Sequence, residues 1–484
     1  MPKASSIRTA LTLFAFVCVS YGLLAWDRVL EPSPQFHFVD LAHSFMRGEL
    51  HTETPKQRAG ASEADDPRAY REAIARSRRA GGWNDWAALR TLTMQDGTKL
   101  TGRFPWPDSS GERAKTFHTL DGESWQVDVR KDLRKDCEGL AGKRCDETTY
   151  YVSFPPGPAL VMLPFASIWG YDTNDVLITI IFGGLNALLL FMLLELLAAR
   201  GHSTRQREDN VWLSVMFALG SVAFFVSVRG EVWFTALVMG VTFNLAFMLA
   251  ALDLKRPMLA GLLLGLGMAT RTPLAFCFVF FAWQLFFPGG RWQRHRWSEI
   301  FKKGSLFALP ILVVGISLMV YNHARFGQAF EFGHSLLGGG AGARIRDHGL
   351  FNTWYLNGNL AAAFVNLPRL MPDAPYINIS KHGLSLLFTT PALLLLARPR
   401  VHAPLGRALW ATVFAAALPG FLYQNTGWEQ FGYRFAMDYF PYLVCLLACG
   451  GRALTPRVKA LIVFGVVVNL FGAITFGRFD ALYY

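Results

Sequence analysis

Apolar segments of membrane-spanning length recur along most of this chain, separated by short polar connections. A helix needs about 20 mostly apolar residues to cross the hydrocarbon core of a bilayer. We therefore expect an all-α polytopic membrane protein with about 11 transmembrane helices, at roughly 8–26, 175–199, 211–228, 232–253, 257–270, 273–288, 305–322, 382–397, 407–423, 435–450 and 458–475.

The positions of Lys and Arg predict the orientation of these helices. Lys3 and Arg8 precede the first apolar segment, and Lys and Arg collect in cytoplasmic connections. With the N-terminus in the cytoplasm, most of the positive residues of the later connections also fall on the cytoplasmic side. The C-terminus is then periplasmic, and the protein is expected in the inner (cytoplasmic) membrane. A cleaved signal peptide is the alternative for residues 1–26, but the apolar run is long and no small-x-small site follows it.

A polar stretch follows the first apolar segment and divides the chain into three parts. Residues 1–50 hold the anchor and, at 32–50, an amphipathic surface helix with Phe38, Leu41 and Phe45 on one face. Residues 51–152 form a periplasmic insert, charged at 55–80. From about 90 onward, residues alternate around two Asp-Gly turns, which predicts a small β-rich fold. Residues 153–484 form the helical bundle, with a long outer loop at 323–381.

The charges of the chain are unevenly distributed. The protein is 52% hydrophobic and only 17% charged, with a net charge of +12. Residues 27–152 hold 20 Lys and Arg against 21 Asp and Glu, so the positive excess lies entirely among the membrane segments and their connections. This distribution indicates topology and contact with anionic lipid. A nucleic-acid partner is disfavoured, because no basic stripe lies on a soluble part of the chain.

Two of the six cysteines lie in the periplasmic insert. Cys137 and Cys145 are eight residues apart, and an oxidising compartment favours a disulfide bond between them. The alternatives are two free thiols or an incomplete metal site. The other four cysteines lie in apolar segments and are interpreted as packing residues. No His-x-His or His-x-x-x-His cluster occurs, so no metal site is assigned. No cofactor is assigned either, and dependence on a divalent metal is left open.

Ionisable and aromatic side chains gather at the predicted outer ends of the apolar segments. Ionisable groups at a membrane boundary are costly to desolvate and tend to be functional or paired, although some polar and aromatic residues there serve only as interfacial anchors. We take three groups as candidates: carboxylates after the first segment, arginines in three separate outer turns, and polar or aromatic side chains that could contact a substrate. They are Asp27, Glu31 and Asp40; Arg271, Arg325 and Arg434; and His37, Tyr151, His323 and Glu429.

Four sequence motifs resemble those of the GT-C glycosyltransferases in their order and positions. They are HFVDLAHSFMRGEL after the first segment, YYVSFPPGPALVMLPF before the second, MATRTP between the fifth and sixth, and YNHARFGQAFEFGH after the seventh; GYRF is a weaker fifth. Within that class, the chain is similar to the bacterial relatives of dolichyl-phosphate-mannose–protein mannosyltransferases (glycosyltransferase family 39) and of aminoarabinose transferases. The resemblance covers the chain except for about 50–148, and it implies a GT-C-like bundle.

The resemblance implies an inverting sugar transfer at the outer membrane face. The donor is a sugar linked to polyprenyl phosphate, held in the membrane lipid. A carboxylate acts as the general base toward the hydroxyl of the acceptor. The resemblance leaves open whether that acceptor is a glycan, a lipid or a protein. Asp40, then Glu31 and Asp27, are the candidate bases, and the three arginines are the candidate ligands of the donor phosphate. The sequence departs from the family pattern where relatives carry an early Asp, because Ser33 and Pro34 stand there.

Two other functions remain open at the level of sequence. A transporter or flippase of lipid-linked saccharide would place its ionisable residues near the middle of the membrane, whereas here they crowd the outer ends. A non-catalytic assembly subunit would use the periplasmic insert to bind a partner, and the missing early Asp favours this alternative. Sugar transfer is the leading hypothesis.

Overall fold

The structure is a computed structural model that describes residues 4–52, 86–104, 114–135, 137, 145–291, 296–337 and 339–484. The chain divides into two compact units. Unit 1 consists of Met1–Ser33, Asn174–Gly315 and Thr353–Tyr484, and unit 2 of Pro34–Thr173 and Ile316–Asn352. These boundaries differ from the three consecutive parts expected from the sequence, because residues 316–352 pack with the much earlier residues 34–173. The predicted charged segment at 55–80 lies outside the described residues.

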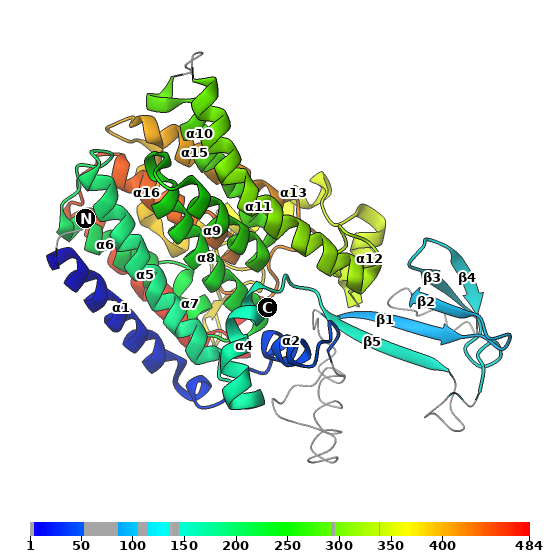
Figure 1. Ribbon diagram of the computed structural model, residues 1–484. Helices are drawn as coiled ribbons and strands as arrows, with labels where there is room; N and C mark the ends of the chain where they lie inside the picture. Colours follow the sequence, from blue (N-terminus) through cyan, green and yellow to red (C-terminus); the bar gives the residue numbers. More distant parts are fainter. Residues whose placement is uncertain are drawn as a thin grey trace. The chain divides into compact units, whose positions relative to one another are not determined.

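Unit 1 is helical (Figure 1). Helix α11 begins in this unit, and its last turns belong to unit 2. A short pairing of β6 (Arg369–Leu370) with β7 (Ile377–Asn378) completes the unit. The helices are α1 (Ala4–Ala25), α5 (Asp175–Ala199), α6 (Arg207–Ala218), α7 (Ala223–Ser227), α8 (Val232–Ala251), α9 (Pro257–Thr270), α10 (Phe278–Phe286), α11 (Trp297–Phe326), α13 (Leu356–Phe364), α14 (Leu386–Thr389), α15 (Pro404–Leu422), α16 (Phe440–Cys449) and α17 (Pro456–Thr475).

Six segments among the described residues are helical, long and apolar enough to cross a membrane. They are Ser5–Val29, Asp175–Ala199, Val232–Leu254, Trp297–Phe326, Pro404–Leu422 and Pro456–Thr475. Three shorter apolar helices, Pro257–Thr270, Thr272–Phe286 and Phe440–Cys449, fall on further predicted segments. The chain therefore has the helices of a membrane protein, while the count of about 11 complete spans stays a prediction.

Two predicted spans are interrupted, one before a proline and one beside a glycine. The segment at 382–397 contains only the four-residue helix α14 and a 3₁₀ helix, Pro391–Ala397. Thr390 between them has φ −141° and ψ 70°, because a residue before proline is disfavoured in the α conformation. The segment at 211–228 breaks between α6 and α7 at Gly220, where an added Cβ would lie 3.3 Å from the carbonyl oxygen of Ile462 in α17.

Helix α1 packs closely against α5 on one side and exposes apolar side chains on the other. A Cβ added at Gly184 of α5 would lie 2.3 Å from Sγ of Cys18, so only glycine permits this approach of α1. The opposite side of α1 is apolar but exposed: Phe16, Val19 and Leu23 are 51%, 61% and 69% accessible. Apolar residues left exposed along a long helix are those expected to contact hydrocarbon.

Unit 2 contains helices α2 (His37–Met46), α4 (Gly157–Trp169) and α12 (Gly339–His348), and a five-stranded antiparallel sheet. The strand order is β4-β3-β2-β1-β5. Both predicted Asp-Gly turns connect neighbouring strands, and their glycines, Gly97 and Gly122, have φ of +89° and +96°, a conformation that glycine adopts without strain. The strands are β1 (Trp86–Thr93), β2 (Lys99–Arg103), β3 (Lys115–Thr119), β4 (Ser124–Val127) and β5 (Asp146–Val152).

The segment at 32–50 forms the expected helix, α2, but its surroundings differ from the expectation. A surface helix would cover its apolar face and leave its polar face in water. In α2 the polar residues His37, Asp40 and Ser44 are buried together with Phe38 and Leu41. Helix α4 packs against α2. Because the polar side of α2 is covered as well, its side chains belong to the interior of unit 2.

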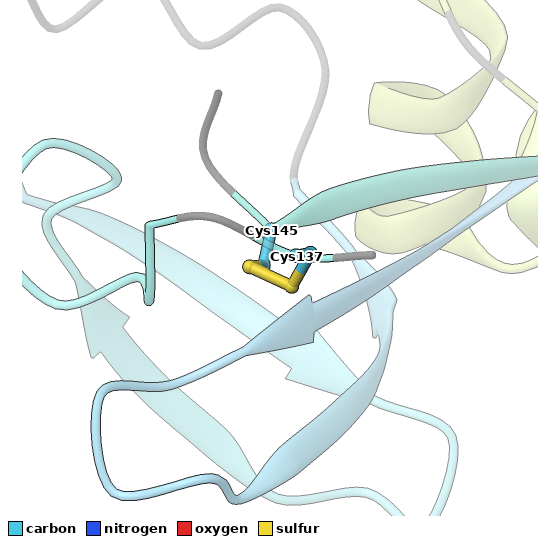
Figure 2. The surroundings of a disulfide bond; sticks show 2 residues. All are labelled: Cys137 and Cys145. Atoms are coloured by element: carbon cyan, nitrogen blue, oxygen red, sulfur yellow. A yellow bond between two sulfur atoms is a disulfide. The ribbon is translucent and has the colours of Figure 1, made fainter. Parts of the chain in front are cut away.

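A disulfide bond joins Cys137 and Cys145 next to β5 (Figure 2). The Cα atoms are 5.5 Å apart, within the range that a disulfide spans. The bond closes a loop of only eight residues, so its effect on the unfolded chain is small and local.

We expect the double variant Cys137→Ser, Cys145→Ser to lower the free energy of unfolding of the sheet by about 2–3 kcal/mol, because the loop ends are no longer tied together. Thermal unfolding of purified protein measures the change. The matched control is reduction of the unmodified protein, which should reproduce the loss. Two freely reactive thiols in the unreduced protein would contradict the pairing.

Candidate functional site

Helix α2 presents one of the predicted carboxylates to the interior of unit 2. Asp40 lies in the first turns of the helix and is 2% exposed. His37, one turn earlier, stacks on the indole of Trp86 at the start of β1, with ring centroids 3.6 Å apart. His43, one turn later, stacks on Tyr171 at 3.9 Å. Asp40 is therefore covered, and aromatic pairs fix the helix on both sides of it.

Arg325, in the last turn of α11, is the buried cation of the same unit. The residue is 4% exposed, and its guanidinium donates to the carbonyl oxygen of Val152 at 2.8 Å and to Oδ1 of Asn322 at 2.8 Å. It lies 3.9 Å from the ring centre of Tyr321. Among the described residues no carboxylate lies within ion-pair distance of Arg325. Glu331 attracts Arg325 from beyond that distance. A buried arginine without a direct acidic partner is costly, and it is suited to hold an anionic group.

The contacts of Arg325 connect it to α2. Val152, whose carbonyl oxygen accepts the hydrogen bond from Arg325, is paired with Trp86 in the β1–β5 register. The ring of Trp86 in turn stacks on His37 of α2. Tyr321, beneath the guanidinium, makes an edge contact with Phe45 of α2 at 6.2 Å. The base of the sheet, α2 and the end of α11 thus form one continuous neighbourhood.

Tyr151 and His334 complete the surroundings of Arg325, while His323 does not. Tyr151 packs edge-on against Phe326 at 5.2 Å, and burial raises the pKa of its phenol, opposed by Arg325. Burial lowers the pKa of His334 to about 4, although Glu331 acts in the opposite direction. His334 is therefore neutral at physiological pH. His323, also in α11, is exposed.

The other two candidate bases, Asp27 and Glu31, belong to unit 1. Asp27 is 67% exposed at its side chain and accepts from Arg478 at 2.9 Å, and Glu31 is exposed. Neither is covered as Asp40 is.

Unit 1 contains a buried carboxylate that was not predicted from the sequence, Asp175. It is the first residue of α5, and its two oxygens accept from the backbone nitrogen of Ser33 at 2.7 Å and from the Ser33 hydroxyl at 2.6 Å. The two residues are 142 positions apart in the sequence. Only the unusual Asp at the start of an apolar segment could have signalled it.

A charged turn lies beside Asp175. A Cβ added at Gly230 would approach Oδ1 of Asp175 to 2.8 Å, and on either side of this glycine Arg229 and Glu231 form an ion pair. Burial alone raises the pKa of Glu231, but Arg229 outweighs it and holds the pKa below its ordinary value. Arg229 also donates to the carbonyl oxygen of Phe476 at 2.9 Å. Arg229 thus connects the start of α8 to the residue after α17, and its charge is balanced by that of Glu231.

Arg271 and Arg434 come together in unit 1. Both guanidinium groups lie against the ring of Phe435, at 5.9 and 5.7 Å from its centre. Arg271, however, is engaged by Asp438 through two hydrogen bonds of 2.7 Å, so two of its donors are occupied. Arg434 donates to the carbonyl oxygen of Glu429 at 2.7 Å. A shared site with Arg325 stays a prediction, because Arg325 belongs to unit 2.

Glu429 and its neighbours form an exposed polar edge of unit 1. The Glu429 carboxylate is 45% exposed and accepts from Lys381 at 2.9 Å. Trp428 lies 4.9 Å from His382 and 5.8 Å from the Lys381 nitrogen. An exposed indole between polar groups is a surface on which a sugar ring could stack, so Glu429 keeps its candidate role in substrate binding.

Among the described residues, no group of three or more His, Cys, Asp or Glu side chains is arranged to hold a metal ion. No family model, curated protein or solved structure matches the chain. The resemblance to GT-C glycosyltransferases therefore rests on the sequence motifs alone.

Proposed function

We propose that this protein is a membrane glycosyltransferase of the GT-C type. It transfers a sugar from a polyprenyl-phosphate donor to an acceptor at the outer face of the inner membrane, with inversion at the sugar. Asp40 is the general base and Arg325 binds the donor phosphate. The observation that carries the proposal is that unit 2 contains, within one neighbourhood, a buried carboxylate and a buried arginine that makes no direct ion pair with a carboxylate of the described residues.

The chemistry needs only these two kinds of group. The Asp40 carboxylate accepts the proton of the acceptor hydroxyl, and the hydroxyl oxygen attacks the anomeric carbon from the side opposite the phosphate. The bond between that carbon and the phosphate oxygen breaks, and its electron pair stays on polyprenyl phosphate. The phosphate gains one negative charge, which the guanidinium of Arg325 stabilises. His37 and Tyr151 lie beside these groups and are proposed to contact the sugar.

The distribution of ionisable residues supports transfer over transport. Helix α5 contains two carboxylates, Asp175 in its first turn and Glu195 near its other end, and α8 contains no charged residue. Glu195 is bonded to Ser6 and Asn210. A transporter typically presents its ion and substrate ligands near the middle of the membrane. The central polar residues here, such as Asn186 and Thr242, are bonded to each other.

Removal of the Arg325 guanidinium tests the proposal. We expect Arg325→Gln to reduce the release of polyprenyl phosphate from a labelled lipid-linked sugar by about 100-fold, since a buried donor to the developing charge is typically worth that much. Arg325→Lys keeps the charge but not the fork of donors and should retain part of the rate. The measurement is turnover by purified protein with lipid-linked sugars extracted from membranes.

Arg130→Gln is the matched control, because Arg130 is an exposed arginine of the same unit. It should leave turnover unchanged. Equal turnover in Arg325→Gln and the unmodified protein would show that Arg325 does not bind the donor phosphate. No turnover with any lipid-linked sugar by the unmodified protein would reject sugar transfer itself.

A further inference from the structure

The sheet of unit 2 has an apolar face and a face that is polar around the end of β2. Residues that alternate along a strand share a face, and so do residues paired across strands. Leu92, Leu100, Phe117 and Val127 lie on the apolar face, where they form a core with Leu133. The part of the other face around Arg103, which we call the polar face, is half-buried or exposed. It consists of Thr91, Thr101, Arg103, Thr116, His118, Ser124 and Gln126.

Arg103, the last residue of β2, is the cation of the polar face. It is half-buried, and its guanidinium makes no hydrogen bond or ion pair with any residue of the described chain. His118 is its direct neighbour across the strands. The Nδ1 atom of His118 is bonded to the hydroxyl of Ser124 at 2.9 Å, and Nε2 has no hydrogen bond among the described residues. The donors of the guanidinium and one nitrogen of the imidazole are thus available to a ligand.

The start of α12 lies beside the end of β2. Ala87 of β1 is paired with β5 on one side and with Leu337 on the other. Arg90, three residues further along β1, is paired on that second side with Gly102, the residue before Arg103. Leu337 therefore continues the line of β2 just beyond Arg103, and α12 begins two residues after Leu337. The end of β2 and the start of α12 are thus neighbours in this unit.

Arg346 of α12 acts on both basic residues of the polar face. Burial and, after it, Arg346 lower the pKa of Arg103, whereas Glu331 raises it. Burial also lowers the pKa of His118, and Arg103 and Arg346 lower it further. The carboxylate of Glu331 already accepts a hydrogen bond from the hydroxyl of Ser335. Basic groups are therefore held beside one another against their mutual repulsion, and an anion bound between them would offset that repulsion.

We propose that the polar face binds the oxyanion of an acidic saccharide, either a phosphate or a carboxylate group. Arg103 and Nε2 of His118 are the direct contacts, and Arg346 adds positive charge beside them. The donors of an arginine form a fork that matches both kinds of oxyanion. The hydroxyl and amide side chains next to these cations, such as Thr101 and Gln126, donate and accept hydrogen bonds, which suits the hydroxyls of a sugar.

A phospholipid headgroup has the same oxyanion but does not fit this face. Acyl chains need an exposed apolar surface next to the cations. The apolar side chains on this side of the sheet, such as Leu89 and Leu120, instead pack with Phe326 and Leu336, and the immediate neighbours of Arg103 on the polar face are hydroxyl, imidazole and amide groups. A saccharide is therefore the favoured source of the oxyanion. This inference does not depend on the proposed sugar transfer.

The test is binding of glucose 6-phosphate, glucuronate and glucose to the purified full-length protein in neutral detergent, measured by titration calorimetry. We expect an acidic sugar to bind at least about tenfold more tightly than glucose, which lacks the oxyanion. Arg103→Gln should weaken this binding about tenfold, because hydrogen bonds between charged groups are lost. His118→Asn keeps a partner for Ser124, removes the second ring nitrogen, and should weaken binding about fivefold.

Arg130→Gln is the matched control and should leave the affinity unchanged, because Arg130 is an exposed arginine of the same unit outside the polar face. Binding of either acidic sugar supports the site if Arg103→Gln and His118→Asn weaken it at an unchanged unfolding temperature, and the tighter of the two identifies the oxyanion. Inorganic phosphate that binds as tightly as glucose 6-phosphate would reject a saccharide. Absence of binding by both acidic sugars, binding of glucose as tight as theirs, or full affinity in Arg103→Gln would reject the site.

Discussion

Replacing Asp40 by asparagine is expected to reduce sugar transfer by at least about 100-fold without unfolding the protein. A carboxamide has nearly the same shape as a carboxylate, but it cannot accept the proton of the acceptor hydroxyl, and general-base catalysis is typically worth 100- to 10,000-fold. Asp40 is 2% exposed in the first turns of α2. The measurement is turnover of a labelled lipid-linked sugar by purified protein, with the unfolding temperature determined in parallel.

Three further carboxylates serve as controls for Asp40. Glu31→Gln and Asp27→Asn should keep near-normal turnover, because both side chains are exposed and lie in unit 1. Asp175→Asn should lower stability, since the carboxylate accepts two hydrogen bonds from Ser33. A loss of turnover in a folded Asp175→Asn protein, with full turnover in Asp40→Asn, would identify Asp175 as the general base in place of Asp40. The pH profile adds a second criterion: loss of the acidic limb in Asp40→Asn is the signature of a missing base.

Local sequence patterns predicted the elements that depend on local physics. Hydrophobic runs identified α1, α5, α8, α15 and α17, because a membrane helix needs little beyond length and apolar side chains. Asp-Gly pairs between alternating residues identified two hairpins of the sheet, since the turn requires a positive φ. The same patterns could not separate a continuous helix from one broken before Pro391, where composition alone is uninformative.

The candidate sites depend on contacts that no local pattern encodes. Asp175 reaches Ser33 across 142 residues, and the pairing of Arg271 with Asp438 spans 167. The burial of both faces of α2 also follows from partners distant in sequence, such as Trp86 against His37. The sequence therefore predicts which residue types are unusual for their surroundings, whereas their partners become visible only in three dimensions.

Breaking the ion pair between Arg271 and Asp438 is expected to produce the largest loss of stability. The side chains are 12% and 6% exposed and are joined by two hydrogen bonds of 2.7 Å. Asp438→Asn leaves the guanidinium of Arg271 buried without its counter-charge, which typically costs about 3–5 kcal/mol. We expect a clear fall in the unfolding temperature of the purified protein, measured in a neutral detergent. Arg271→Met should give a similar fall, because it leaves the carboxylate of Asp438 unpaired.

The double variant Arg271→Met, Asp438→Leu separates a structural role of this pair from phosphate binding. Removal of both charges leaves no unpaired ion, so the double variant should be more stable than either single one, and the double-mutant cycle gives the coupling. If Arg271 only joins α9 to the segment before α16, the affinity for the lipid-linked donor should be the same in the folded double variant as in the unmodified protein. If the double variant instead loses affinity for the donor while its stability is retained, Arg271 is a ligand of the donor phosphate, and Asp438 is the residue that orients it.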